Sequence, residues 1–249
     1  MALGLNHIQV RSIQMNWVRP AQLASAESTA PATGTMLFAV LLSVFMCAQI
    51  VSSVVGASPL SSELGLRSEI WSWSDPVGYG RTVTYALLHV DAQHFIGNVM
   101  VLLLVGSVVE WRLGIRVIGP LLLVGAVVAA LTHILIFPSE ARTLIGASGV
   151  VSTLFGAATI VAGDVGIRIR LPRSYWLSLT LRRLIILWLL FQVAGLVMVY
   201  LDPSNPSSVA YWAHLAGFGV GLIAGVIVWK RRQTQTSPAL SGASSHAGD

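Results

Sequence analysis

The sequence predicts an all-α polytopic membrane protein, a bundle of six transmembrane helices with both termini in the cytoplasm. Hydrophobic residues make up 55% of its 249 residues and charged residues only 10%, and the mean hydropathy is +0.75. A soluble domain has about 25% charged residues, so the composition excludes an ordinary soluble protein. Two further observations support the prediction: six long apolar runs, and a one-sided distribution of arginine and lysine.

Each apolar run is close to the roughly 20 residues that an α-helix needs to cross a 30 Å hydrocarbon core. The second and fourth runs fall a little short, so we expect those helices to stand upright or to begin below the membrane surface. The six runs cover about residues 36–56, 92–109, 117–137, 147–163, 184–201 and 209–229.

Basic residues predict the orientation, because cytoplasmic loops of membrane proteins are enriched in arginine and lysine. With the N-terminus inside, twelve of the 15 basic residues lie on the cytoplasmic side and three lie outside. The inner set is Arg11, Arg19, Arg112, Arg116, Arg168, Arg170, Arg173, Arg182, Arg183, Lys230, Arg231 and Arg232. The outer set is Arg67, Arg81 and Arg142.

Three regions follow from this topology. Residues 1–34 form a cytoplasmic N-terminal segment, either disordered or carrying a short amphipathic helix over 5–18 on the membrane surface. Residues 35–231 form the six-helix membrane domain. Residues 232–249 form a disordered cytoplasmic tail rich in Ser, Gly and Ala. The loop over 57–91 is long and holds several aromatic residues, so we expect it to fold onto the outer membrane surface.

Several function classes receive no support from the sequence. The pI near 10 would suit a nucleic-acid partner, but the basic residues flank apolar runs, so topology explains them and we expect no nucleic acid. Cys47 is the single cysteine, so no intramolecular disulfide can form. No cluster with metal-ligand spacing is present, and we expect neither a metal nor a cofactor.

Four polar side chains share one depth in the predicted bundle. His94, Asn98, Ser148 and His214 each lie in the first two turns of a helix that runs from outside to inside. Polar groups are costly inside a membrane unless they meet one another or water. We therefore expect them to converge just below the outer surface.

Helical periodicity directs two of them toward each other. Ser148 shares a face with Ser152 and Gly156, and His214 shares a face with glycines at i+3, i+7 and i+11. Stripes of small residues let helix backbones approach closely. If these stripes pack together, His214 can accept the Ser148 proton as a general base. No acid lies beside His214 in the sequence, so a third member of a catalytic group is not evident.

His94 and Asn98 are four residues apart and share a face of the second segment. An uncharged amide near a serine nucleophile suits stabilisation of an oxyanion. The alternative is that both side chains only bond across helices for packing. The common depth with Ser148 and His214 favours the oxyanion role.

The chain resembles a known family, the rhomboid intramembrane serine proteases, over about residues 36–230. The resemblance rests on three motifs in the family's order: His94-Phe95-Ile96-Gly97-Asn98, then Gly146-Ala147-Ser148-Gly149, then Ala213-His214-Leu215-Ala216-Gly217-Phe218-Gly219-Val220-Gly221. It implies Ser148 as nucleophile, His214 as base, and an oxyanion site formed by His94, Asn98 and the Ser148 backbone N–H. The stretch Glu110-Trp111-Arg112-Leu113-Gly114 matches a further family motif.

The resemblance also implies structural roles and a substrate class. The structural set is Arg81, His89, Glu110, Arg112, Gly146, Gly149, Gly217 and Gly221. From the residues themselves we expect Glu110 and Arg112 to pair with each other or to cap the second helix. The implied substrates are single-pass or multi-pass membrane proteins, cut near the outer face of a bilayer, with a bacterial plasma membrane as the expected location.

Two departures from the family pattern stand out. Arg81 follows Gly80 where the family often has tryptophan, and Ser152 stands where an aromatic ring often stacks on the base histidine. Tyr211 or Trp212 could supply that ring. The departure at Ser152 leaves open a weak or inactive rhomboid-like protein that binds membrane helices. A third hypothesis is a transporter or channel that uses the polar side chains as a path. It is disfavoured because these side chains lie near one surface and do not span the bilayer.

Overall fold

The computed structural model describes residues 32–163, 165–170, 176–202 and 209–236. The expected helix over 5–18, residues 1–31 of the N-terminal segment, Arg173 and residues 237–249 of the tail lie outside the described residues. Within them, five helical stretches are long and apolar enough to cross a membrane. The protein is therefore a mostly helical, multi-pass membrane protein.

The membrane-length stretches match five of the six apolar runs. They are α1 (Thr33–Val54), the continuous stretch Ala92–Leu113, α6 (Ile115–Ile136), α8 (Leu181–Leu201) and α9 (Tyr211–Thr236), of which Tyr211–Arg231 is the span. The fourth run forms α7 (Ser148–Val161), which has only 14 residues. At 1.5 Å per residue α7 is roughly 21 Å long, shorter than a bilayer core.

The second run is longer than the sequence predicted. The stretch Ala92–Leu113 joins α4 (Ala92–Val101), a π-helical turn η3 (Leu102–Gly106) and α5 (Ser107–Leu113) without a break. Its 22 residues continue through the polar residues that follow the apolar run. A helix that contains Glu110 remains stable in this setting because the carboxylate has buried partners, described below.

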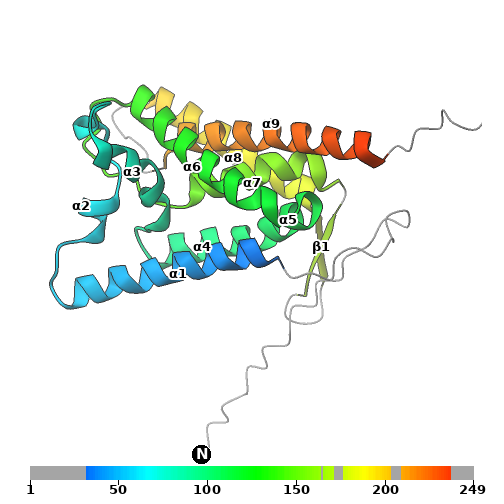
Figure 1. The fold of residues 1–249 in the computed structure, drawn as a ribbon, viewed down its shortest axis with the longest axis horizontal. Helices are drawn as coiled ribbons and strands as arrows, with labels where there is room; N and C mark the ends of the chain where they lie inside the picture. The colour runs from blue at the N-terminus through cyan, green and yellow to red at the C-terminus, as the bar shows by residue number, and fades with distance from the viewer. Residues whose placement is uncertain (1–31, 164, 171–175, 203–208, 237–249) are drawn as a thin grey trace, which may run out of the picture.

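The long loop folds onto one end of the bundle (Figure 1). It contains α2 (Leu60–Leu64), the 3-10 turn η1 (Ser68–Ile70), α3 (Pro76–Thr84) and the 3-10 turn η2 (Tyr85–Leu87). Asp75 caps α3, since its side chain accepts from the Val77 backbone N–H at 2.9 Å. The start of α1 and the end of α9 both lie at the opposite end of the bundle (Figure 1).

One part of the all-α prediction is wrong. Residues 166–180 contain an antiparallel hairpin of β1 (Gly166–Arg170) and β2 (Trp176–Thr180), with Gly166 opposite Thr180 and Arg170 opposite Trp176. It lies at the end of the bundle away from α2 and α3 (Figure 1). Apolar and polar residues alternate along both strands, which is the strand period. The arginines in this segment also fit a cytoplasmic loop, so counting them did not predict the two strands.

The core is centred on α7, which packs against α6 and α9. Eleven of its residues are buried, whereas α1 and α8 each bury three. The exposed surfaces of α1 and α8 are dominated by large apolar side chains. Such surfaces suit contact with lipid, and they place α7 at the protein-filled centre of the bundle.

Candidate active site

Ser148 lies at the first position of α7, directly after a turn that only glycine accommodates well. Gly146 has φ +128°, and a side chain there would come 2.6 Å from His94 Cε1. The Gly146 N–H donates to the Tyr85 carbonyl at 3.0 Å, which fixes the turn. Backbone N–H groups in the first turn of a helix have no acceptor within that helix, so those around Ser148 are available to a ligand.

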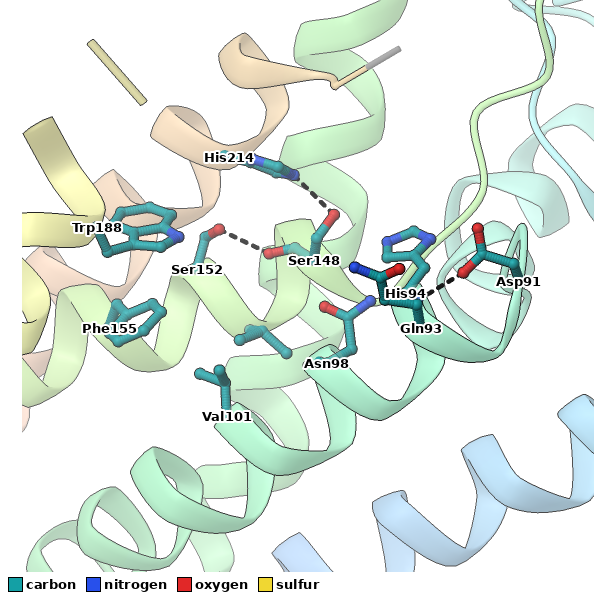
Figure 2. A pocket seen from close by; sticks show the side chains of 12 residues that line it. Asp91, Gln93, His94, Asn98, Val101, Ser148, Ser152, Phe155, Trp188 and His214 are labelled. Atoms are coloured by element: carbon teal, nitrogen blue, oxygen red, sulfur yellow. Dashed lines mark hydrogen bonds between the residues drawn. The ribbon is translucent and has the colours of Figure 1, made fainter. Parts of the chain in front are cut away.

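The α7–α9 seam, which we define by Gly149, Gly156, Gly217 and Gly221, brings His214 to Ser148. A Cβ on Gly217 would overlap the Gly149 carbonyl oxygen, and a Cβ on Gly221 would overlap the carbonyl oxygen of Thr153. The two backbones are therefore in direct contact. His214 Nε2 lies 2.7 Å from Ser148 Oγ, a distance suited to proton transfer, and Figure 2 shows this bond at one side of the pocket.

The second ring nitrogen of His214 has a partner that sequence reasoning missed. Gln192 of α8 places Oε1 2.8 Å from His214 Nδ1, and both side chains are buried. The signal was available in the sequence: Gln192 is a lone amide in an otherwise apolar segment, and such residues in membrane helices are expected to find polar partners.

Asn98 carries a buried donor at the cavity that Ser148 also lines. The residue is 7% exposed, and its Nδ2 has no hydrogen-bond partner among the described residues. Buried polar atoms are usually paired, so an orphan amide donor beside a serine is suited to an incoming acceptor. Figure 2 shows Asn98 and His94 on the same side of α4, next to Ser148.

His94 lies at the start of α4, close to the turn before the serine. Asp91 caps this helix, because its side chain accepts from the His94 backbone N–H at 2.8 Å. The imidazole lies against Gly146. The structure thus brings all four predicted polar residues, His94, Asn98, Ser148 and His214, to the lining of one cavity.

That cavity has a volume of about 540 Å³, within the range of ligand pockets. One side is polar, with Asp91 and Gln93, and the other is apolar, with Val101, Phe155 and Trp188. It can therefore hold a peptide backbone beside Ser148 and an apolar side chain farther in. Within the described ranges, no three His, Cys, Asp or Glu side chains gather as metal ligands do.

Two residues expected to be structural support the loop and the start of α4. Arg81 Nε donates to the Glu63 carbonyl at 3.0 Å and ties α3 to α2. His89 is buried, with ring centroids 5.2 Å from His94 and 5.4 Å from Phe95. Burial, and secondly the proximity of His94, lower the pKa of His89 to about 4.

The expectation that Glu110 caps the second helix is wrong. Its carboxylate accepts from the Gly34 N–H at 2.9 Å, the Thr35 N–H at 2.8 Å and the Thr35 hydroxyl at 2.7 Å. Glu110 therefore caps the start of α1, where an anion is favoured by the free N–H groups and the helix dipole. The Arg112 guanidinium lies over the Trp111 ring, 4.5 Å from its centroid.

Ser152 directs its hydroxyl to the backbone and not to the His214 ring. Its hydroxyl donates to the Ser148 carbonyl at 2.6 Å, one turn back along α7. Of the two proposed substitutes for the missing ring, Tyr211 lies against Gly195 of α8 and Trp212 is 43% exposed. Gln192 contacts the His214 ring at Nδ1, the nitrogen that does not face Ser148.

The fold and the site define a class of protein: a multi-pass membrane bundle with a serine, a histidine and a buried, unpaired amide donor around one cavity. Comparison of the sequence with known families agrees with this class. The family model of the rhomboid domain matches residues 77–231. The chain belongs to the rhomboid family.

Two curated relatives are similar over much of this region. Rhomboid-related protein 2 of Mus musculus is 29% identical over 175 residues, covering 69% of this chain and 52% of the relative. Rhomboid-related protein 1 of Caenorhabditis elegans is 29% identical over 168 residues, covering 66% of this chain and 41% of the relative. The matched regions thus span about half of these relatives or less.

Proposed function

We propose that this member of the rhomboid family is an intramembrane serine endopeptidase that cleaves transmembrane helices near the outer face of the membrane. The observation that carries the proposal is the 2.7 Å contact of Ser148 Oγ with His214 Nε2. The buried, unpaired amide of Asn98 beside it supplies the second requirement, a donor for developing negative charge.

The chemistry follows from these groups. As Ser148 Oγ bonds to the scissile carbonyl carbon, its proton passes to His214 Nε2. The resulting oxyanion accepts hydrogen bonds from Asn98 Nδ2 and the Ser148 backbone N–H, with His94 lining the same site. When the C–N bond breaks, His214 returns the proton to the leaving amine. Water, activated by the same histidine, then hydrolyses the acyl-enzyme.

The substrate must present an extended peptide to the cavity, because a helix shields its own carbonyl groups. We propose membrane-protein substrates whose helix unwinds at the cleavage position, aided by glycine, proline or small residues there. The proposed setting is the cell membrane, with six helices, both termini in the cytoplasm and the cavity near the outer surface. The charge asymmetry of the loops supports this orientation.

The test is cleavage of a transmembrane reporter by purified protein in vesicles. Ser148→Ala and His214→Ala are each expected to abolish cleavage while the melting temperature stays close to that of the parent. Ser43→Ala is the control, since Ser43 is likewise a serine in an apolar helix but lies in α1, where its hydroxyl bonds to the Ala39 carbonyl at 2.8 Å. Cleavage that persists in the Ser148→Ala protein would refute the proposal.

An inactive rhomboid-like protein that binds membrane helices is the second candidate, and the replacement of the usual aromatic ring by Ser152 favours it. A fluorophosphonate probe separates the two functions, because it reacts only with an activated serine. Stable labelling of Ser148 supports the protease. A well-folded protein that captures reporter helices but never labels supports the binding function.

A further inference from the structure

The helix α8 buries a polar side chain, Gln192, beside the active site, and the proposed Ser148–His214 dyad does not use it. Only Leu181, Ile185 and Gln192 are buried on this helix, and the first two lie in its first two turns. Gln192 is 2% exposed, so an amide is held in the interior at the place where α8 passes the base.

The atoms in contact determine which nitrogen of His214 holds the proton. Gln192 presents Oε1 to Nδ1 at 2.8 Å, and a carbonyl oxygen can only accept. Nδ1 therefore carries the proton in the neutral ring. Nε2 is then left with its lone pair, and this is the atom 2.7 Å from Ser148 Oγ. Hydrogen bonds thus run in one direction, from Ser148 to His214 to Gln192.

We propose that Gln192 is a positioning residue for the base, the third member of a Ser148–His214–Gln192 group. Its amide oxygen holds the imidazole in the tautomer that can accept the serine proton, and it accepts from Nδ1–H of the imidazolium that forms. In soluble proteases an aspartate, or an asparagine amide in the papain type, serves the histidine in this way. The inference rests on the proposed protease function.

The surroundings of the ring support the assignment. Ser152 bonds back to the Ser148 carbonyl, and Tyr211 lies against Gly195, so neither performs this task. A neutral amide suits the site because it satisfies Nδ1 without adding a buried charge, which would be costly within a membrane. This arrangement offers a physical reason why the chain can dispense with an aromatic ring at position 152.

The experiment compares full-length variants in detergent or vesicles by the rate of Ser148 labelling with a fluorophosphonate. Gln192→Met keeps the length of the side chain but loses the strong acceptor, and we expect labelling to slow by about 10- to 100-fold, the effect of one hydrogen bond to a charged group. Gln192→Glu restores an acceptor oxygen and is expected to label faster than Gln192→Met. Equal rates for these two variants would overturn the proposal, because packing alone would then explain the loss.

Ile185→Ala is the matched packing control. Ile185 is buried on the same helix, seven residues before Gln192 and so on the same face. Its truncation should lower the melting temperature yet leave the labelling rate near that of the parent. If Ile185→Ala slows labelling as much as Gln192→Met does, any disturbance of α8 has this effect, and Gln192 has no special role.

The tautomer itself gives a readout that does not depend on activity. In protein labelled with 15N-histidine, the His214 signal is assigned by its loss in His214→Ala and recorded in mildly alkaline buffer. We expect the Nδ1–H tautomer in the parent and a mixture in Gln192→Met. An Nε2–H tautomer in the parent would overturn the proposal. If the parent has the Nδ1–H tautomer but never labels, the protease function fails while the Gln192 contact stands.

Discussion

His214 is held between two contrasting parts of the molecule, the α7–α9 seam on one side and α8 on the other. In the seam, backbone meets backbone: Gly156 lies against the Phe218 carbonyl, and Gly217 and Gly221 lie against carbonyls of α7. By contrast, α8 buries three of its 21 residues. Ser148 and His214 therefore stand on the closely packed part, and Gln192 stands on the loosely held one.

The contacts that do hold α8 come from a few side chains. Trp188 stacks between Phe155 and Phe218, with centroid distances of 4.9 and 5.8 Å. Near the other end, the Tyr211 ring fills the space left by Gly195. These are contacts between individual side chains, not between backbones. We therefore infer that α8 is the element that can shift to admit a substrate while Ser148 and His214 stay in contact.

The strongest test of the contrast is Gly221→Leu. A side chain there must enter the space of the Thr153 carbonyl, and backbone cannot yield as a flexible side chain can. We expect a cost well above the ~1–3 kcal/mol of ordinary overpacking, with loss of the folded protein in thermal unfolding and of all probe labelling. Gly219→Leu is the control, since nothing lies within 4 Å of that position. Equal damage from both would mean that the seam is not the stabilising contact.

A smaller effect is expected from Gly195→Leu, which removes the space for Tyr211. The C-terminal half of α8 should shift, the protein should stay folded with a melting temperature lower by a few degrees, and Ser148 labelling should slow because Gln192 moves away from His214. Ala194→Leu, on the exposed side of the same helix, should leave both measurements unchanged. Unfolding of Gly195→Leu would contradict the view of α8 as the less essential element.

Acid is expected to lower the stability of the protein through His89, which lies outside both the α7–α9 seam and α8. Because the pKa of this histidine is about 4 in the folded protein and 6.5 ordinarily, the unfolded chain binds a proton first as pH falls. Its contribution to stability is present above pH 6.5 and is lost progressively toward pH 4. We expect the melting temperature of the parent to fall over this range more steeply than that of His89→Phe. Parallel curves would show that His89 does not titrate in this way.

The smallest effect is expected on the outer face of α8. Leu190 is 60% exposed, so Leu190→Ala removes little internal contact and should change the free energy of unfolding by no more than about 0.5 kcal/mol. Reporter cleavage should stay within twofold of the parent. A large loss of cleavage with stability intact would instead mark this face as a place where substrate docks, and would sharpen the role of α8.

Local pattern was sufficient to predict much of this arrangement. Apolar length located the helices, and the period of small residues placed Ser148 and His214 on faces that the structure brings together. It failed where neither a stripe of small residues nor a common depth pointed to the partner. The carboxylate of Glu110 bonds to residues 75 and 76 positions away, and Gln192 meets a histidine 22 residues on. Periodicity shows which face a side chain occupies but cannot show which other element will cover it.

The β-hairpin was missed for a different reason. Its alternation of apolar and polar residues is visible in the sequence, but the arginines there also fit a cytoplasmic loop. Since both patterns are satisfied by the same residues, charge counting alone could not distinguish a loop from a pair of strands.

The π-helical turn η3 has a consequence for how this fold tolerates change in length. A π turn accommodates one more residue than an α turn, so η3 holds an insertion within a continuous helix. Five π-helical residues wind through nearly the same angle as four α-helical ones. Deleting one of Leu102, Leu103 or Leu104 would therefore restore regular α-helix there and leave Asn98 and Glu110 on their present faces. A deletion between Asn98 and η3 would instead rotate α4 by about 100° relative to α5, so that Glu110 would still cap α1 but Asn98 would turn away from the cavity. The irregular turn is thus the place where this helix can lose a residue and keep both groups in position.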